Sequence, residues 1–175
     1  MAPRFGGDQR AVTIDLVARE RERERLRSLY LAEPAVRAHS TAGGVHHVAL
    51  MCSDVERTIN FYQGLLGFPL VEIFENRDYK GSTHLFFDIG HGNTIAFFDF
   101  PGLDLGPYAE VLGGLHHLAI SIDADAWRVA KQRLEAADVS VHIDSEISMY
   151  FSDPDGVRLE LIAERLGSLY GTPFQ

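Results

Sequence analysis

The strongest constraint on this chain is an internal repeat, in which one stretch of sequence recurs in altered form seventy residues later. "GGVHHVALMCSDVERTINFYQGLLG" opens the first unit and "GGLHHLAISIDADAWRVAKQRLEAAD" opens the second, so that His47 corresponds to His117. Each unit begins with a glycine pair and a short apolar strand, and a helical pattern follows. The chain is therefore predicted to build one structural module twice.

Both units have the pattern β-α-β-β-β. A helix is expected after Asp54 in the first unit and after Asp123 or Asp125 in the second, because aspartate is a favoured N-cap. Apolar side chains recur there at helical spacing: Val55, Ile59, Tyr62 and Leu66, then Trp127, Ala130, Leu134 and Ala137. Strands are expected over 68–75, 82–90 and 93–100, and again over 139–144, 148–153 and 157–164.

Three segments follow from the repeat. Residues 1–43 are expected to form an N-terminal helical extension and linker, 44–105 the first module, and 106–175 the second module with a C-terminal tail. The stretch 17–33 is rich in alternating charges and predicts a solvated surface helix, with a dimerisation or lid arm as the alternative.

Composition excludes several classes of partner. The formal net charge of −9 argues against nucleic acid or an anionic membrane as a partner. The single cysteine, Cys52, cannot form an internal disulfide and indicates a reducing compartment. No apolar run has the length of a signal peptide or a membrane span, so a cytoplasmic protein is expected.

Strand alternation places the histidines and one glutamate on comparable faces. In "HHVALM" and "HHLAIS", the bulky aliphatic residues must pack on the following helix, so His47 and His117 face the other way. In "VRLELI", Val157, Leu159 and Leu161 form the helix-facing row. Glu160 therefore faces a cavity of the same kind as the two histidines.

Two imidazoles and one carboxylate on a concave surface predict a metal site with free coordination positions. The donor set of His47, His117 and Glu160 suits Fe(II), Mn(II), Zn(II) or Ni(II), and the two-histidine-one-carboxylate combination favours Fe(II) oxygen chemistry. The alternative for each histidine is an ordinary packed or surface residue, and the repeat favours the ligand interpretation.

Residues 44–164 resemble the vicinal oxygen chelate superfamily. The resemblance implies an α+β fold in which two β-α-β-β-β modules form a cup-shaped mixed sheet around a central cavity and a divalent metal. His47, His117 and Glu160 match the positions of its ligands. A fourth ligand, which glyoxalase I has, corresponds here to Ala96, and this disfavours glyoxalase I chemistry.

Within that superfamily, "VHIDSEISMYFSDPDGVRLE" is similar to the signature of type I extradiol ring-cleavage dioxygenases. The similarity implies that Tyr150 donates a hydrogen bond to a bound catechol-like aromatic substrate, that His142 lies near the substrate hydroxyls, and that O₂ is the second substrate. It also implies a homodimer. The acid–base residue is left open between His84, His91 and His142. Such dioxygenases mostly carry four modules, and this chain has two.

Two other functions fit the same fold. One is a metal-dependent lyase or transferase of the glyoxalase or fosfomycin-thiol type. A phosphonate substrate, however, would need cationic side chains in the cavity, and the segment after Glu160 offers only Arg165. Ala49 also stands where a hydroxyl would be required. The other is a drug-binding protein that holds aromatic ligands without metal, which the presence of all three expected ligands disfavours.

Overall fold

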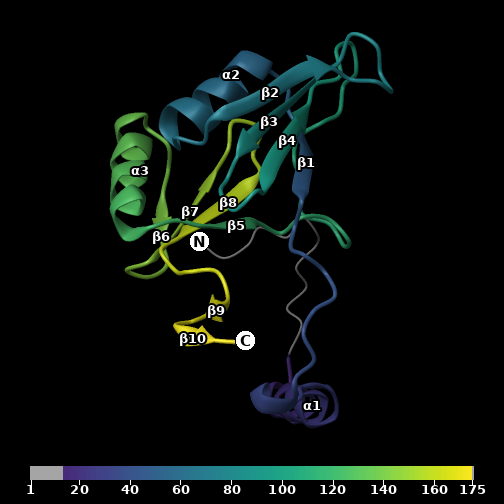
Figure 1. Cartoon of the computed structure of the whole chain (residues 1–175), viewed down its shortest axis with the longest axis vertical. Helices are drawn as coiled ribbons and strands as arrows, with labels where there is room; N and C mark the ends of the chain where they lie inside the picture. The colour runs from purple at the N-terminus through teal and green to yellow at the C-terminus, as the bar shows by residue number, and fades with distance from the viewer. Residues whose placement is uncertain (1–13, 175) are drawn as a thin grey trace. The chain divides into compact units, whose positions relative to one another are not determined.

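The structure is a computed structural model in which residues 14–174 are described, and the chain divides into two compact units. The larger unit, residues 44–166, contains both repeats; among the described residues, the smaller unit combines 14–43 with 167–174. Figure 1 shows the elements of both. The two repeats therefore fold as one body, which contains all the predicted site residues.

The first repeat forms a four-stranded mixed sheet with one helical segment. Its elements are β1 (His47–Met51), α2 (Val55–Ile59), a π-helical turn η2 (Asn60–Leu65), β2 (Leu70–Glu75), β3 (Thr83–Asp88) and β4 (Thr94–Phe98). The strand order is β1-β4-β3-β2, with β1 parallel to β4 and the other pairs antiparallel. This sheet is called sheet A below.

The second repeat has the same connectivity. Its elements are β5 (Leu118–Ser121), α3 (Ala124–Ala136), β6 (His142–Ile143), β7 (Ser148–Ser152) and β8 (Arg158–Ile162). Sheet B has the order β5-β8-β7-β6, with β5 parallel to β8. The predicted β-α-β-β-β repeat and the α+β class are confirmed; the two sheets are separate in strand pairing rather than one continuous sheet.

The helices begin where aspartates cap them. The Asp54 carboxylate accepts a hydrogen bond from Arg57 N at 2.9 Å, and Asp123 accepts one from Ala126 N at 2.8 Å, so Asp123 rather than Asp125 is the second cap. The first helix differs from expectation beyond residue 59, where the 60–65 segment widens into a π turn. This turn carries the buried rings of Phe61 and Tyr62.

The core is continuous between the two modules. Alternate strand residues face it, as the sequence pattern predicts, and the fully buried set includes Leu85, Phe87, Ile95 and Phe97 from sheet A and Met149, Leu159 and Leu161 from sheet B. The Phe61 ring lies 6.2 Å from that of Phe151, between centroids. The modules therefore share one core while each sheet keeps a second face with partly exposed side chains.

The turn "DPDG" joins the modules. Tyr62 Oη donates to Asp153 Oδ2 at 3.0 Å, and Arg57 Nη2 lies 2.9 Å from Asp155 Oδ1. Backbone N–H groups of Asp155 and Val157 also donate to Asp153. Burial raises the pKa of Asp153 and, together with the Asp153 charge, holds the pKa of Tyr62 well above its usual value. The turn of the second module is thus fixed to the helical segment of the first module.

The smaller unit consists of short elements. They are helix α1 (Leu16–Tyr30), η1 (Pro34–Val36) and a hairpin of β9 (Ser168–Leu169) and β10 (Thr172–Pro173). No described residue of α1 is buried, and Glu–Arg pairs three residues apart support it. An Arg37 hydrogen bond of 2.8 Å to Phe174 O ties the unit together. None of the helices within residues 14–174 is long and apolar enough to cross a membrane.

Candidate metal centre

Three residues predicted to belong to the site lie in one row across sheet B. His142 on β6 pairs with Tyr150 on β7, Tyr150 pairs with Glu160 on β8, and Glu160 pairs with Ala119 on β5. Residues that pair directly across strands present their side chains on the same face. The intervals between these residues in the sequence therefore bring the imidazole, the phenol and the carboxylate side by side in the sheet.

Glu160 is a buried carboxylate with polar partners. Its side chain is 8% exposed, its Oε1 accepts a 2.5 Å hydrogen bond from Ser148 Oγ, and its Oε2 lies 3.3 Å from His117 Nε2. The Tyr150 ring stands edge-on to the His117 ring, with centroids 5.6 Å apart. Leu159 and Leu161 point into the core on either side of Glu160. The apolar run thus places one carboxylate on the opposite face of a buried strand.

The Tyr150 hydroxyl is held in its protonated form. Burial, followed by a hydrogen bond to Glu160 and the charge of Glu160, raises the pKa of Tyr150 to about 12. At neutral pH this phenol is therefore a hydrogen-bond donor beside the carboxylate.

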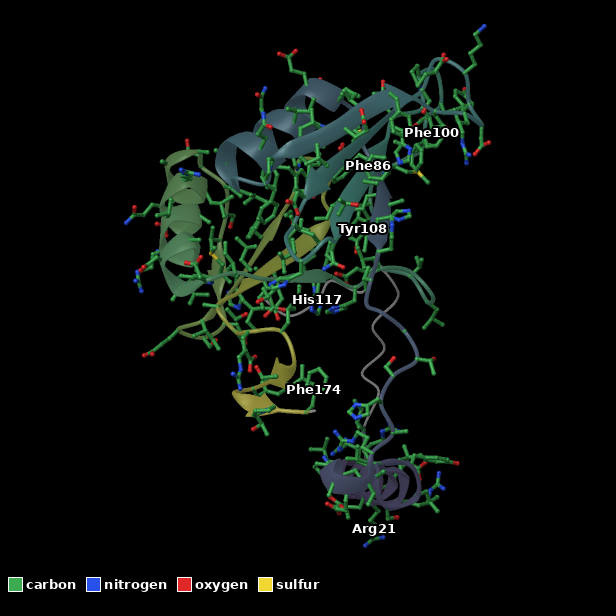
Figure 2. All side chains as sticks on the ribbon, in the orientation of Figure 1. Arg21, Phe86, Phe100, Tyr108, His117 and Phe174 are labelled. Carbon is green, nitrogen blue, oxygen red and sulfur yellow. The ribbon has the colours of Figure 1, made fainter. Side chains whose placement is uncertain are left out.

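His47 lies on sheet A and does not join His117 and Glu160 within one chain. It is exposed, and its ring lies 6.1 Å from that of Phe86 between centroids. Figure 2 labels Phe86 and His117, which come from different sheets. Among residues 14–174, no three His, Cys, Asp or Glu side chains are grouped so that they could hold one metal ion. A single chain brings together two of the three predicted ligands.

Sheet A repeats the geometry of sheet B with different chemistry. Ala96 pairs with Ala49 as Glu160 pairs with Ala119, and Phe86 pairs with Ala96 as Tyr150 pairs with Glu160. Alanine therefore occupies the position equivalent to the glutamate. Sheet A supplies one imidazole, from His47, and no carboxylate at the matching position.

Aromatic residues cover the rest of this face. The rings of His84 and Phe98 stack at 3.8 Å, and Phe74 and Phe86 lie 5.1 and 4.2 Å from His84. The face is partly open, since Phe74 is 44% and Met51 56% exposed. His84 Nε2 is buried without a hydrogen-bond partner among the described residues, and burial, with the nearby His47 and Arg77 charges, lowers the pKa of His84.

The other predicted acid–base candidates lie at the edges. His91 is exposed in the hairpin between β3 and β4, with a φ of 52°, at the same end of sheet A as His47, which pairs with Thr94. His142 is exposed on β6. Ser148 is a further residue of the site that no sequence motif indicates; the available signal is strand alternation, since Ser148 lies on the same face of β7 as Tyr150.

A cavity of about 870 Å³ lies between β1, the connection after β4 and the "DPDG" turn. It is lined by Ala49 and Met51 of β1, by the 99–108 segment and by the turn at Asp155, and it includes neither His117 nor Glu160. The faces that carry the nitrogen and oxygen donors, rather than this cavity, therefore define the candidate site.

The donors present fit a divalent metal. Imidazole nitrogen and carboxylate oxygen are common ligands of Fe, Mn, Zn and Ni, and the His117–Glu160 pair offers both from rigid neighbouring strands. Ser148 orients the carboxylate, which is the usual role of a hydrogen bond to a ligand. Since Glu160 is almost fully buried, a bound cation would compensate its desolvation.

Comparison with known proteins agrees with this fold. The family model of the Glyoxalase/Bleomycin resistance protein/Dioxygenase superfamily matches residues 44–161, and the chain belongs to this superfamily. This is the vicinal oxygen chelate group that the repeat and motifs resemble.

Individual relatives within it differ in activity. MhqA of Bacillus subtilis, named as a candidate ring-cleaving dioxygenase, is 27% identical over 139 residues, which cover 74% of this chain and 43% of MhqA. The chain thus spans less than half of that relative. The lactoylglutathione lyase of Escherichia coli O157:H7 is 30% identical, covering 68% of this chain and 91% of the lyase.

Solved structures share the fold. A variant of the fosfomycin resistance protein FosX from Listeria monocytogenes, complexed with Mn(II) and 1S,2S-dihydroxypropylphosphonic acid, superposes with a TM-score of 0.54 at 22% identity. The match covers 72% of this chain and 96% of that chain. At this identity the likeness concerns the fold alone.

Proposed function

We propose that the protein is a metal-dependent enzyme, an Fe(II) extradiol-type dioxygenase that acts on a catechol-like substrate. The observation that carries the proposal is the row of His142, Tyr150 and Glu160, with His117 3.3 Å from the glutamate. These are the residues that the ring-cleavage motif implies. The similarity to MhqA, whose name refers to ring cleavage, also supports a dioxygenase.

The complete site requires a second copy of the chain. His47 and the aromatic face of sheet A are partly open in one chain, and so are His117 and Ala119 on sheet B. In a dimer with twofold symmetry, sheet A of each copy would cover sheet B of the other, because the contact must be reciprocal. Each of two equivalent sites would then combine His117 and Glu160 of one copy with His47 of the other.

The side chains around such a site have distinct tasks. Bound Fe(II) would supply the redox chemistry between a catechol and O₂. Mn(II), Zn(II) or Ni(II) could be bound by the same donor atoms. Tyr150 donates its hydroxyl proton as a hydrogen bond to a substrate oxygen, and His142 exchanges a proton with the substrate hydroxyls. Phe86 and Phe98 pack on the ring and exclude water.

Two further proton carriers lie on sheet A. His84 presents a buried nitrogen without a partner, and His91 stands at the hairpin near His47. Of these, His84 is the better placed for acid–base work, because its ring is fixed by stacking on Phe98.

The second candidate function is a lyase or transferase of the glyoxalase or fosfomycin-resistance type. The 30% identity to lactoylglutathione lyase favours it. Ala96 at the position equivalent to Glu160 disfavours it, because a second carboxylate is missing there. A drug-binding role without metal would leave the buried Glu160 without a cation.

Anaerobic loading with Fe(II), followed by a panel of catechols, tests the proposal. A ring-cleaving enzyme should take up oxygen and form yellow product, and metal analysis should find one ion per chain. His117→Ala and Glu160→Ala should lose the metal while keeping their circular dichroism spectra; Glu56→Gln, an exposed change on α2, is the control. Oxygen uptake absent with every catechol, or unchanged metal in either ligand variant, would contradict the proposal.

A further inference from the structure

Arg158 places a permanent positive charge beside the proposed metal ligands. It lies two residues before Glu160 on β8, so the two side chains start from the same face of sheet B. Its Nη1 lies 3.3 Å from His116 Nε2, and His116 Nδ1 lies 2.7 Å from His117 Nδ1. In the described strands β1 to β8, Arg158 is the only lysine or arginine. The guanidinium is thus linked to His117 through the ring of His116.

The Arg158 guanidinium is already paired with a carboxylate from another part of the chain, that of Glu110. Arg158 Nη2 lies 2.6 Å from Glu110 Oε1, and the Glu110 side chain is only 11% exposed. The other oxygen, Glu110 Oε2, is buried without a hydrogen-bond partner among the described residues. A guanidinium can bind both oxygens of a carboxylate in parallel, and a buried oxygen left unpaired costs stability. The pair is therefore only half satisfied.

Glu110 belongs to the connection between the modules, residues 99–117, which contains no helix or strand. Within this connection, the Tyr108 hydroxyl donates a hydrogen bond to Leu115 O. Next to Glu110, Val111 and Leu112 form an exposed turn that is closed by Gly114 N and Val111 O. Glu110 thus lies in irregular backbone beside an exposed turn, although its own side chain is largely buried.

We propose that Arg158 binds the carboxylate of an aromatic-acid substrate and that Glu110 holds this position when no substrate is bound. The inference rests on the proposed function, since it places the arginine in the same site. The internal carboxylate indicates the chemistry that the arginine accepts. A substrate carboxylate that binds both guanidinium nitrogens would replace Glu110 at Nη2 and the His116 contact at Nη1, and would make the second hydrogen bond that Glu110 does not make.

Matched ligands test this assignment. Protocatechuate, a catechol carboxylate, and its neutral amide are titrated by calorimetry into the full chain, with and without Zn(II), which permits binding without turnover. The wild type should bind the carboxylate on the order of 10- to 100-fold tighter than the amide, because only the carboxylate makes charge-assisted hydrogen bonds to the guanidinium. Arg158→Gln should erase this difference, and Glu110→Gln should raise carboxylate affinity by removing the competitor.

Control variants separate a binding role from a structural one. Arg128→Gln on the exposed face of α3 loses the same charge and should keep the preference. Glu56→Gln should leave carboxylate affinity unchanged. An arginine that merely held the connection would change the affinities for both ligands equally.

The outcomes distinguish this inference from the proposed reaction. A preference that survives Arg158→Gln, or no preference in the wild type, would overturn the inference. Ring cleavage of catechol without any preference for the carboxylate would contradict the carboxylate site and leave the proposed reaction supported. A preference that depends on Arg158, without ring cleavage, would contradict the proposed reaction and support the carboxylate site.

Discussion

Ser148 Oγ donates a 2.5 Å hydrogen bond to Glu160 Oε1, from one strand to its neighbour on the same face of sheet B. Because the bond fixes the carboxylate that is proposed to bind metal, Ser148→Ala should weaken metal affinity by roughly 10- to 100-fold. Ser152→Ala, at an exposed position of the same strand and face, is the control. Competition against a metal indicator measures both, and equal affinity in the two variants would contradict the role of Ser148.

Tyr150→Phe should lower turnover more than it lowers metal retention. The hydroxyl has a pKa of about 12, so near neutral pH it acts as a hydrogen-bond donor beside Glu160 and not as a ligand. Steady-state kinetics with the best catechol, together with metal analysis of the same sample, separates the two effects. Wild-type turnover in this variant would remove Tyr150 from the reaction.

Tyr62→Phe should destabilise the junction of the modules. The substitution leaves the buried Asp153 without the phenol that donates to it at 3.0 Å, and the loss is expected to be roughly 1–3 kcal/mol in the free energy of unfolding. Denaturant titration measures this change. In the control, Tyr79→Phe, the lost hydroxyl lies 3.5 Å from Pro101 O in an exposed contact, and stability should change little.

Cys52 should be inert in the folded protein. Burial raises the pKa of its thiol from 9.0 to about 11, so iodoacetamide at about pH 8 should label the unfolded chain and leave the folded chain unlabelled. Because the folded pKa is the higher one, the protonated thiol contributes stability that is complete below pH 9.0 and disappears as the pH rises through about 11. The stability advantage of wild type over Cys52→Ala should therefore shrink across that window; rapid native labelling would contradict the burial.

The repeat and its strand faces could be predicted from the sequence because side-chain alternation and helix caps are local properties. Leu159 and Leu161 are buried and Glu160 lies on the opposite face, as their alternation indicates. Strand alternation likewise places Ala96, which pairs with Ala49 on the neighbouring strand, at the position equivalent to Glu160. The row of His142, Tyr150 and Glu160 follows from hairpin register.

The placement of one module against the other could not be predicted in this way. Strand parity shows that His47 and His117 occupy equivalent faces, but it does not show whether those faces meet in one chain. That arrangement depends on the contact of Tyr62 with Asp153 and on the shared core, which join residues far apart in sequence. The Glu110–Arg158 pair was missed likewise, because its glutamate comes from an irregular connection.

Metal content of mixed variants tests most directly whether two copies share each site. His47→Ala and Glu160→Ala, purified separately, should each retain little metal. After co-refolding in equal amounts, about half of the dimers are mixed, and one of the two sites in each mixed dimer carries no substitution. About one quarter of the wild-type metal content should therefore be recovered. Recovery no greater than the average of the separate variants, or full metal retention by His47→Ala alone, would contradict the shared site.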